Sequence, residues 1–103
     1  MKKLEDTINL MNSSDYKERF MAEYWQTKIR YEKLKVFNNK IEAAQLTRFS
    51  EVDNKVKEPK HDCPADILKE QQTSMGNYLH LLEIRAVMEN IDLNQVFSMN
   101  KEV

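Results

Sequence analysis

A run of 33 residues, from Asp15 to Thr47, contains neither glycine nor proline, so the chain must fold around a long helix. All 103 residues together include one glycine and two prolines, whereas sandwiches and barrels need such residues at their many turns. Within the run, seam positions recur at alternating steps of four and three, the period of a helix packed against another helix. These positions are Phe20, Tyr24, Thr27, Tyr31, Leu34, Asn38 and Ile41.

A second long helix is predicted over residues 63–91, where Pro64 suits the first helical position. Gly76 lies inside this helix, where glycine costs about 1 kcal/mol relative to alanine. We therefore expect another helix to approach closely at Gly76. The residues of this helix that keep the same rhythm of three and four are Leu68, Gln71, Met75, Tyr78, Leu82, Arg85 and Glu89.

A short helix is predicted over residues 3–12, and residues that prefer caps and turns follow it. Asp15 and Glu18 have the spacing of a capping box, in which each side chain binds a backbone N–H group of the first turn. Ser14 is an equally good cap. With either choice, the first long helix is predicted over residues 15–47.

Residues 48–62 carry many charges and a proline, and they are predicted to form an exposed linker. Because this linker joins the two long helices, they are expected to run antiparallel. Residues 92–103 are predicted to be a short tail. The predicted fold class is all-α: one domain over residues 1–103, an antiparallel two-helix hairpin with a short N-terminal helix, assembled as an oligomeric bundle.

The oligomer is predicted because each long helix has a second apolar stripe that a hairpin would leave in water. A contiguous exposed apolar patch marks an interface, and a closed symmetric assembly would cover it. The two stripes are Met21, Trp25 and Ile29 on the first helix, and Leu79, Ala86 and Leu93 on the second.

Composition excludes several functions. The net charge is −1 and the isoelectric point is about 6.1, which does not favour nucleic-acid binding. One cysteine and two histidines supply neither a disulfide nor a cysteine-based zinc site, so no metal is predicted. There is no apolar run of about 20 residues for a membrane span and no apolar signal segment at the start. A cytoplasmic location is therefore expected.

No motif for catalysis stands out. The sequence has no glycine-rich phosphate loop, paired-carboxylate motif or metalloprotease string. His61, Asp62 and Cys63 are the residue types of a catalytic cluster, but they are adjacent within the predicted linker, where a cap is the simpler explanation. His80 lies beside the apolar face and is predicted to be a half-buried surface residue. We predict no catalytic residue and no enzymatic activity.

One strip of the first long helix combines aromatic rings with cations. Tyr24, Lys28, Tyr31 and Lys35 are spaced i, i+4, i+7 and i+11, which places them along one side. Aromatic rings stack on bases and cations bind phosphates, so this strip suits a nucleotide-like ligand. The alternative is that the tyrosines and the lysine stems pack laterally in the helix pair, with their polar tips in water.

On the second helix, Gln71, Tyr78 and Arg85 recur at intervals of seven residues as a polar line in an apolar helix. Arg85 lies in the predicted seam, where a cation needs either a carboxylate or a bound anion. A carboxylate partner such as Glu32 or Glu83 is one solution. A phosphate held by Arg85 from two or more copies around an oligomer axis is the other.

Three strings resemble small phage-encoded helical-hairpin proteins: DYKERFMAEYWQTKIRYEKL, CPADILKEQQTSMGNYLHLLEIRA and ENIDL. Through Gln71, Gly76 and the Arg85-Ala86 pair, the second string is similar to the hairpin of phage anti-CBASS and anti-Thoeris sponge proteins. This resemblance covers residues 15–93. It implies an oligomeric helical cage that binds a cyclic dinucleotide or cyclic ADP-ribose messenger and withholds it from host effectors.

Two functions are therefore considered. The first is a phage counter-defence protein that, in the cytoplasm of an infected bacterium, sequesters a cyclic nucleotide immune messenger as a homo-oligomer, without catalysis or a cofactor. The alternative is a protein–protein inhibitor or adaptor, comparable to anti-CRISPR proteins, that covers a host protein with a face bearing Met, Trp and Phe. The residues predicted to bind the ligand are Tyr24, Lys28, Tyr31, Lys35, Tyr78 and Arg85.

Overall fold

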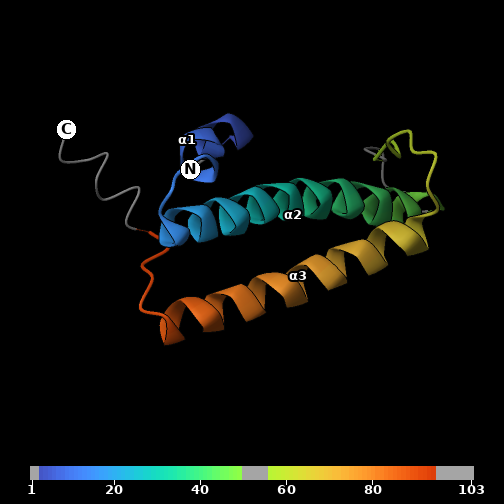
Figure 1. Cartoon of the computed structure of the whole chain (residues 1–103). Coiled ribbons are helices and arrows are strands. Elements are labelled where there is room, and N and C mark those ends of the chain that lie inside the picture. The colour runs from blue at the N-terminus through green and yellow to red at the C-terminus, as the bar shows by residue number, and fades with distance from the viewer. Residues whose placement is uncertain (1–2, 50–55, 95–103) are drawn as a thin grey trace.

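The computed structural model describes residues 3–49 and 56–94, and within these ranges it contains helices and no strand, which confirms the all-α class (Figure 1). Residues 50–55 of the predicted linker and residues 95–103 of the predicted tail lie outside the described part. The elements are a 3-10 helix η1 (Leu4–Thr7), α1 (Ile8–Met11), α2 (Tyr16–Thr47) and α3 (Ala65–Met88). No helix in the described part is long and apolar enough to cross a membrane.

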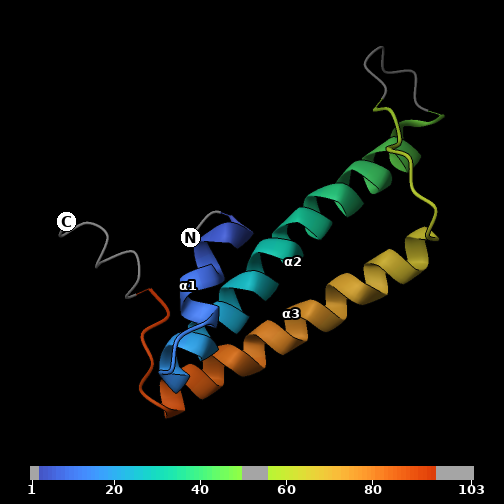
Figure 2. The same ribbon diagram turned by 45° about the horizontal axis from the view of Figure 1, so that its top comes forward.

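Helices α2 and α3 lie side by side and run in opposite directions (Figures 1 and 2). Hydrogen bonds between them fix this register. The hydroxyl of Tyr24 donates to Glu83 at 2.7 Å, and the amide nitrogen of Asn38 donates to Gln72 at 2.8 Å. As residue numbers increase along α2, the numbers of the residues that they contact on α3 decrease.

The main hydrophobic core fills the end of the pair where α2 begins and α3 ends. Leu82 is its most enclosed member, with 1% of its surface exposed. Burial of such a side chain contributes about 1.5–3 kcal/mol relative to leaving it exposed. The buried members of this core are Phe20, Met21, Tyr24, Leu79, Leu82, Ala86 and Ile91.

The second apolar stripes are buried within the chain, so the expectation that they are left in water is wrong. Met21 is 6% exposed and Leu79 is 4% exposed. The short N-terminal helices pack on α2, where the amide of Gln26 donates to the hydroxyl of Thr7 at 3.0 Å. After the end of α3, the chain turns back toward α2, where the indole N–H of Trp25 donates to the carbonyl of Leu93 at 2.8 Å. Met21, Leu79 and Ala86 belong to the core between the long helices, and the short segments add Leu10 and Leu93 against it without a second copy.

The N-terminus of α2 is capped by Asp15, whose carboxylate accepts the backbone N–H of Lys17 at 3.0 Å. In the predicted capping box, Glu18 would accept the backbone N–H of Asp15, but Ser13 takes this role. The hydroxyl of Ser13 accepts the backbone N–H of Asp15 and donates to Glu18 at 2.7 Å. Ser13 therefore connects the two acidic residues of the motif.

Helix α3 is shorter than the predicted range at both ends. Pro64 is the N-cap rather than the first helical residue, with φ −56° and ψ 143°. At the other end Asn90 adopts φ 57°, the left-handed conformation that stops a helix. The backbone N–H of Ile91 then donates to the carbonyl of Ala86 at 2.8 Å, and Ile91 turns into the core. This Schellman-type end stops the helix at Met88.

A glycine on α3, Gly76, and a buried asparagine on α2, Asn38, lie where the two long helices approach each other. A Cβ atom placed on Gly76 would lie 3.3 Å from Cε1 of Tyr31, so the predicted close approach is made by a side chain of α2. Asn38 is 3% exposed, and its amide nitrogen also donates to the carbonyl of Leu68 at 3.1 Å. Because a buried amide tolerates few alternative pairings, Asn38 helps to fix the register of α2 against α3.

Candidate functional site

The strip predicted on α2 begins with Tyr24, which takes part in packing α2 against α3. Tyr24 is 6% exposed, and its hydroxyl donates to Glu83 on α3. Burial and then this hydrogen bond raise the pKa of Tyr24, so the phenol stays neutral across the physiological range. Its ring is part of the core and is not a free stacking surface.

The next residues of the strip also make contacts within the chain. Lys28 pairs with Glu32 at 3.1 Å, and its ammonium lies 5.9 Å from the centroid of the Tyr31 ring. Tyr31 is half-buried against Gly76, while Lys35 is exposed. These contacts are those of the alternative interpretation, in which the tyrosines and the lysine stems pack laterally in the helix pair. The ligand role of these residues stays a prediction.

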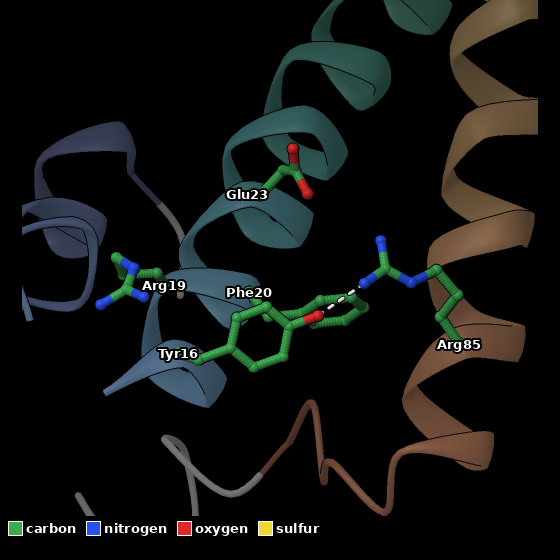
Figure 3. Close-up of a pocket in the computed structure, with 5 residues that line it drawn as sticks. All are labelled: Tyr16, Arg19, Phe20, Glu23 and Arg85. Carbon is green, nitrogen blue, oxygen red and sulfur yellow. Dashed lines mark hydrogen bonds between the residues drawn. The ribbon is translucent and has the colours of Figure 1, made fainter. Parts of the chain in front are cut away.

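A hollow of about 220 Å³ lies instead between the first turns of α2 and the last turns of α3 (Figure 3). Three of its residues, Tyr16, Phe20 and Glu23, are spaced i, i+4 and i+7, so they share one side of α2. Arg85 reaches it from α3. The residues that line it are Tyr16, Arg19, Phe20, Glu23 and Arg85.

Arg85 is held by a closed set of hydrogen bonds. Its Nε donates to Glu89 at 3.0 Å, one helical turn further along α3, and its Nη2 donates to the hydroxyl of Tyr16 at 2.5 Å. That hydroxyl in turn donates to the other carboxylate oxygen of Glu89 at 2.9 Å. The guanidinium is therefore oriented from two directions, although about half of its side chain is exposed.

The electrostatics of this set keep the ion pair charged. The hydrogen bond with Glu89 raises the pKa of Arg85, and the same carboxylate raises the pKa of Tyr16. In return, the hydrogen bond from Tyr16, followed by that from Arg85, lowers the pKa of Glu89. At neutral pH, a neutral phenol therefore links a full positive charge to a full negative charge.

Aromatic rings form the floor of the hollow. Cζ of Arg85 lies 4.9 Å from the centroid of the Phe20 ring, a distance at which a cation is attracted to the face of a ring. The rings of Tyr16 and Phe20 have centroids 6.2 Å apart and are tilted by 54°. The guanidinium therefore lies against an aromatic ring, and Nη1 takes no part in the hydrogen bonds to Glu89 and Tyr16.

Glu23 lies near both Arg85, with which it lines the hollow, and another predicted site residue, Tyr78. A hydrogen bond to Glu23 raises the pKa of Tyr78. Glu23 leaves α2 on the side that faces α3, whereas Arg19 turns away from Arg85 (Figure 3). The guanidinium of Arg19 donates to the carbonyl of Ser13 at 2.9 Å. The charges that meet at the hollow are therefore those of one arginine and its acidic neighbours.

Of the predicted site residues, Arg85 lines the hollow, and Tyr78 is linked to it through Glu23, whereas Lys35 lies further along α2. The sequence interpretation missed Tyr16, Phe20 and Glu23, which line the hollow with Arg85, and Glu89, which pairs with Arg85. The signal was the i, i+4, i+7 spacing at the start of α2 and the Arg85–Glu89 spacing of four.

A second hollow, of about 260 Å³, lies further along the same two helices. It has amide, hydroxyl and charged side chains, and no aromatic residue lines it. It therefore offers no stacking surface for a base. Its lining residues are Asn38, Asn39, Glu42, Lys69, Gln72 and Thr73.

Among protein families, the one whose model matches the chain is described as Sequestin, and the match spans residues 14–88. This range contains the whole of α2 and α3, and it therefore includes every residue that lines the first hollow. No curated protein and no solved structure matches the chain.

Proposed function

The chain belongs to the Sequestin family, and we propose that it is a phage counter-defence protein that binds and withholds a cyclic nucleotide messenger. The family name denotes sequestration, which is compatible with a protein that holds a molecule without changing it. The observation that carries the proposal is the Arg85 guanidinium, oriented by Tyr16 and Glu89 above the ring of Phe20. An oriented guanidinium binds phosphate, and aromatic rings beside it stack on a base.

Binding without catalysis is the simpler assignment for this geometry. Near Arg85, the carboxylates accept hydrogen bonds from Arg85, Tyr16 or Tyr78, and no nucleophile is paired with a base there. The His61 ring, which could act as a base, makes its 2.6 Å contact with the carbonyl oxygen of Cys63 rather than with the thiol. This contact supports a role for His61 in holding the linker.

The proposal is tested by a thermal-shift panel of cyclic dinucleotides and cyclic ADP-ribose isomers. A ligand present at one hundred times its dissociation constant adds about 2.7 kcal/mol to the stability of the folded state. For a domain of this size, each kcal/mol raises Tm by about 4–8 °C, so we expect a shift of roughly 10 °C or more for the cognate messenger. Inorganic phosphate at the same concentration controls for ionic stabilisation. A flat panel would contradict the proposal.

We further propose that the protein assembles through an exposed face of α3, formed by Leu81, Ile84 and Met88. These residues are 58%, 42% and 79% exposed. Ser74 and Asn77 continue the same 3,4 stripe, so the face carries no charge over these positions. A two-fold interface places a surface against itself, and an uncharged face meets this requirement without like-charge repulsion. A second copy is therefore the occupant that we assign to it.

Assembly is tested by changing Leu81 and Ile84 together to glutamate and measuring mass by light scattering at micromolar concentration. We expect the parent protein to have at least twice the chain mass of 12.3 kDa and the double variant to have the mass of one chain. Val36→Glu, on the exposed side of α2, is the control and should stay assembled. A parent protein of 12.3 kDa would contradict the assembly.

The second candidate function, a protein–protein inhibitor or adaptor, is favoured by the same α3 face if a host protein covers it. The face with Met, Trp and Phe that the sequence suggested for this role is not exposed, because Phe20 and Met21 are buried and Trp25 is half-buried. A flat ligand panel together with a monomeric parent protein would select this second function.

A further inference from the structure

We propose that Glu23 is the acceptor for the ribose hydroxyls of the nucleotide whose phosphate binds Arg85, and that it excludes a second phosphate from the hollow. This inference rests on the proposed function and assigns a specificity role to a residue outside the predicted set. It starts from the side chains that line the hollow of about 220 Å³, which include two arginines and one carboxylate. Arg19 directs its guanidinium to the carbonyl of Ser13, so Arg85 and Glu23 are the charges left to meet a ligand there.

Glu23 is placed to accept hydrogen bonds from a ligand. It lies one turn beyond Phe20 on the same side of α2, and it lines the hollow together with Arg85 of α3 (Figure 3). A hydrogen bond with Glu23 raises the pKa of the Tyr78 hydroxyl on α3. An ionised carboxylate has acceptor sites for about four hydrogen bonds, so the bond from Tyr78 leaves room for further donors.

Glu23 is free of the ion pair that holds Arg85. The guanidinium donates to Glu89 and Tyr16, and these two residues orient each other through their own hydrogen bond. Glu23 is therefore not needed to position Arg85. Its negative charge faces the space in which an anion bound to Arg85 would lie.

A ligand that satisfies both side chains must carry an anion next to hydroxyl donors. A nucleotide does so, because its phosphate is attached to a ribose whose hydroxyls are good donors to a carboxylate. A second phosphate at the position of the sugar would instead meet the negative charge of Glu23 at short range. The hollow therefore selects one phosphate with its ribose over two adjacent phosphates. Within the proposed function, this favours cyclic dinucleotides over cyclic ADP-ribose isomers, which carry a pyrophosphate.

The test compares adenosine 5′-monophosphate with its 2′,3′-dideoxy analogue, each titrated into the full chain and followed by NMR. We expect the parent protein to bind the ribonucleotide about tenfold more tightly than the dideoxy analogue. In Glu23→Ala this ratio should fall to about one. Glu32→Ala is the matched control, because this carboxylate lies on the same helix but pairs with Lys28, and it should keep the parent ratio.

Inorganic pyrophosphate supplies a readout of opposite sign. Glu23→Gln removes the charge but keeps an acceptor oxygen, so pyrophosphate should bind this variant several-fold more tightly than it binds the parent protein. General damage to the hollow would weaken both probes together and would overturn the inference. Equal affinity of the parent protein for the two nucleotides, or the absence of binding by the ribonucleotide, would also overturn it. The cyclic nucleotide panel tests the proposed function independently of these results.

Discussion

Replacement of Leu82 by alanine will lower the free energy of unfolding by about 2–5 kcal/mol, a large part of the stability of a chain this small. Leu82 is 1% exposed and belongs to the same core as Tyr24 and Ala86. Removing its isobutyl group loses the transfer free energy and leaves a cavity, because two long helices held in register cannot collapse freely around it. Urea unfolding followed by far-UV circular dichroism will measure the change.

The control for this prediction is Leu46→Ala, since Leu46 is 75% exposed near the end of α2. The same atoms are removed there, and the change should stay within about 0.5 kcal/mol. If Leu82→Ala does not fold, Leu82→Met conserves most of the volume and should lose less than about 1.5 kcal/mol. Equal losses at Leu46 and Leu82 would show that the core does not lie where the structure places it.

The long helices could be predicted because their signals are local and repeated. The predicted first helix, residues 15–47, differs from α2 only in that Asp15 is the cap. The predicted end of the second helix was too late because the 3,4 pattern continues through Glu89. The stop comes from the left-handed conformation of Asn90, a single residue that a periodic pattern does not reveal.

The covering of the second apolar stripes could not be predicted from periodicity. Helix α1 has four residues, and the turn that brings Leu93 to Trp25 is irregular. A helix was predicted over residues 3–12, which the structure divides into η1 and α1, but its pattern does not reveal that it packs on α2. Both stripes are nevertheless buried or half-buried, so the argument for an oligomer now depends on Leu81 and Ile84, at positions next to the predicted seam.

The candidate site depends on the register between α2 and α3, which one sequence does not determine. The pattern indicated that Arg85 needs an anion, but the suggested partners Glu32 and Glu83 bind Lys28 and Tyr24 instead. The structure supplies Glu89 as the carboxylate of Arg85. Tyr16 could not be assigned to the same site, because it is 69 positions away in sequence. Contacts such as the bond between Asn38 and Gln72 set that register, and they become visible only when the helices are packed.

Replacement of Arg85 by alanine will weaken binding of the messenger that gives the largest thermal shift by at least tenfold. Each charge-assisted hydrogen bond to phosphate contributes about 1.5–3 kcal/mol, and alanine removes all of those that Arg85 makes. Arg85→Lys should also lose affinity, since a lysine cannot bind both Tyr16 and Glu89 while it presents a planar edge to phosphate. Isothermal titration calorimetry will measure the change, with the mass of each variant checked by light scattering.

The matched control is Arg19→Ala, because Arg19 lines the same hollow but directs its guanidinium to the carbonyl of Ser13. We expect this variant to bind within about threefold of the parent protein. Arg85→Ala also leaves Glu89 without its cation, so part of the loss is repulsion between this carboxylate and the phosphate. Arg85→Ala with Glu89→Gln should therefore recover part of the affinity. An assembled Arg85→Ala variant that binds as tightly as the parent protein would place the ligand elsewhere, whereas a variant that dissociates would make Arg85 a structural ion-pair residue.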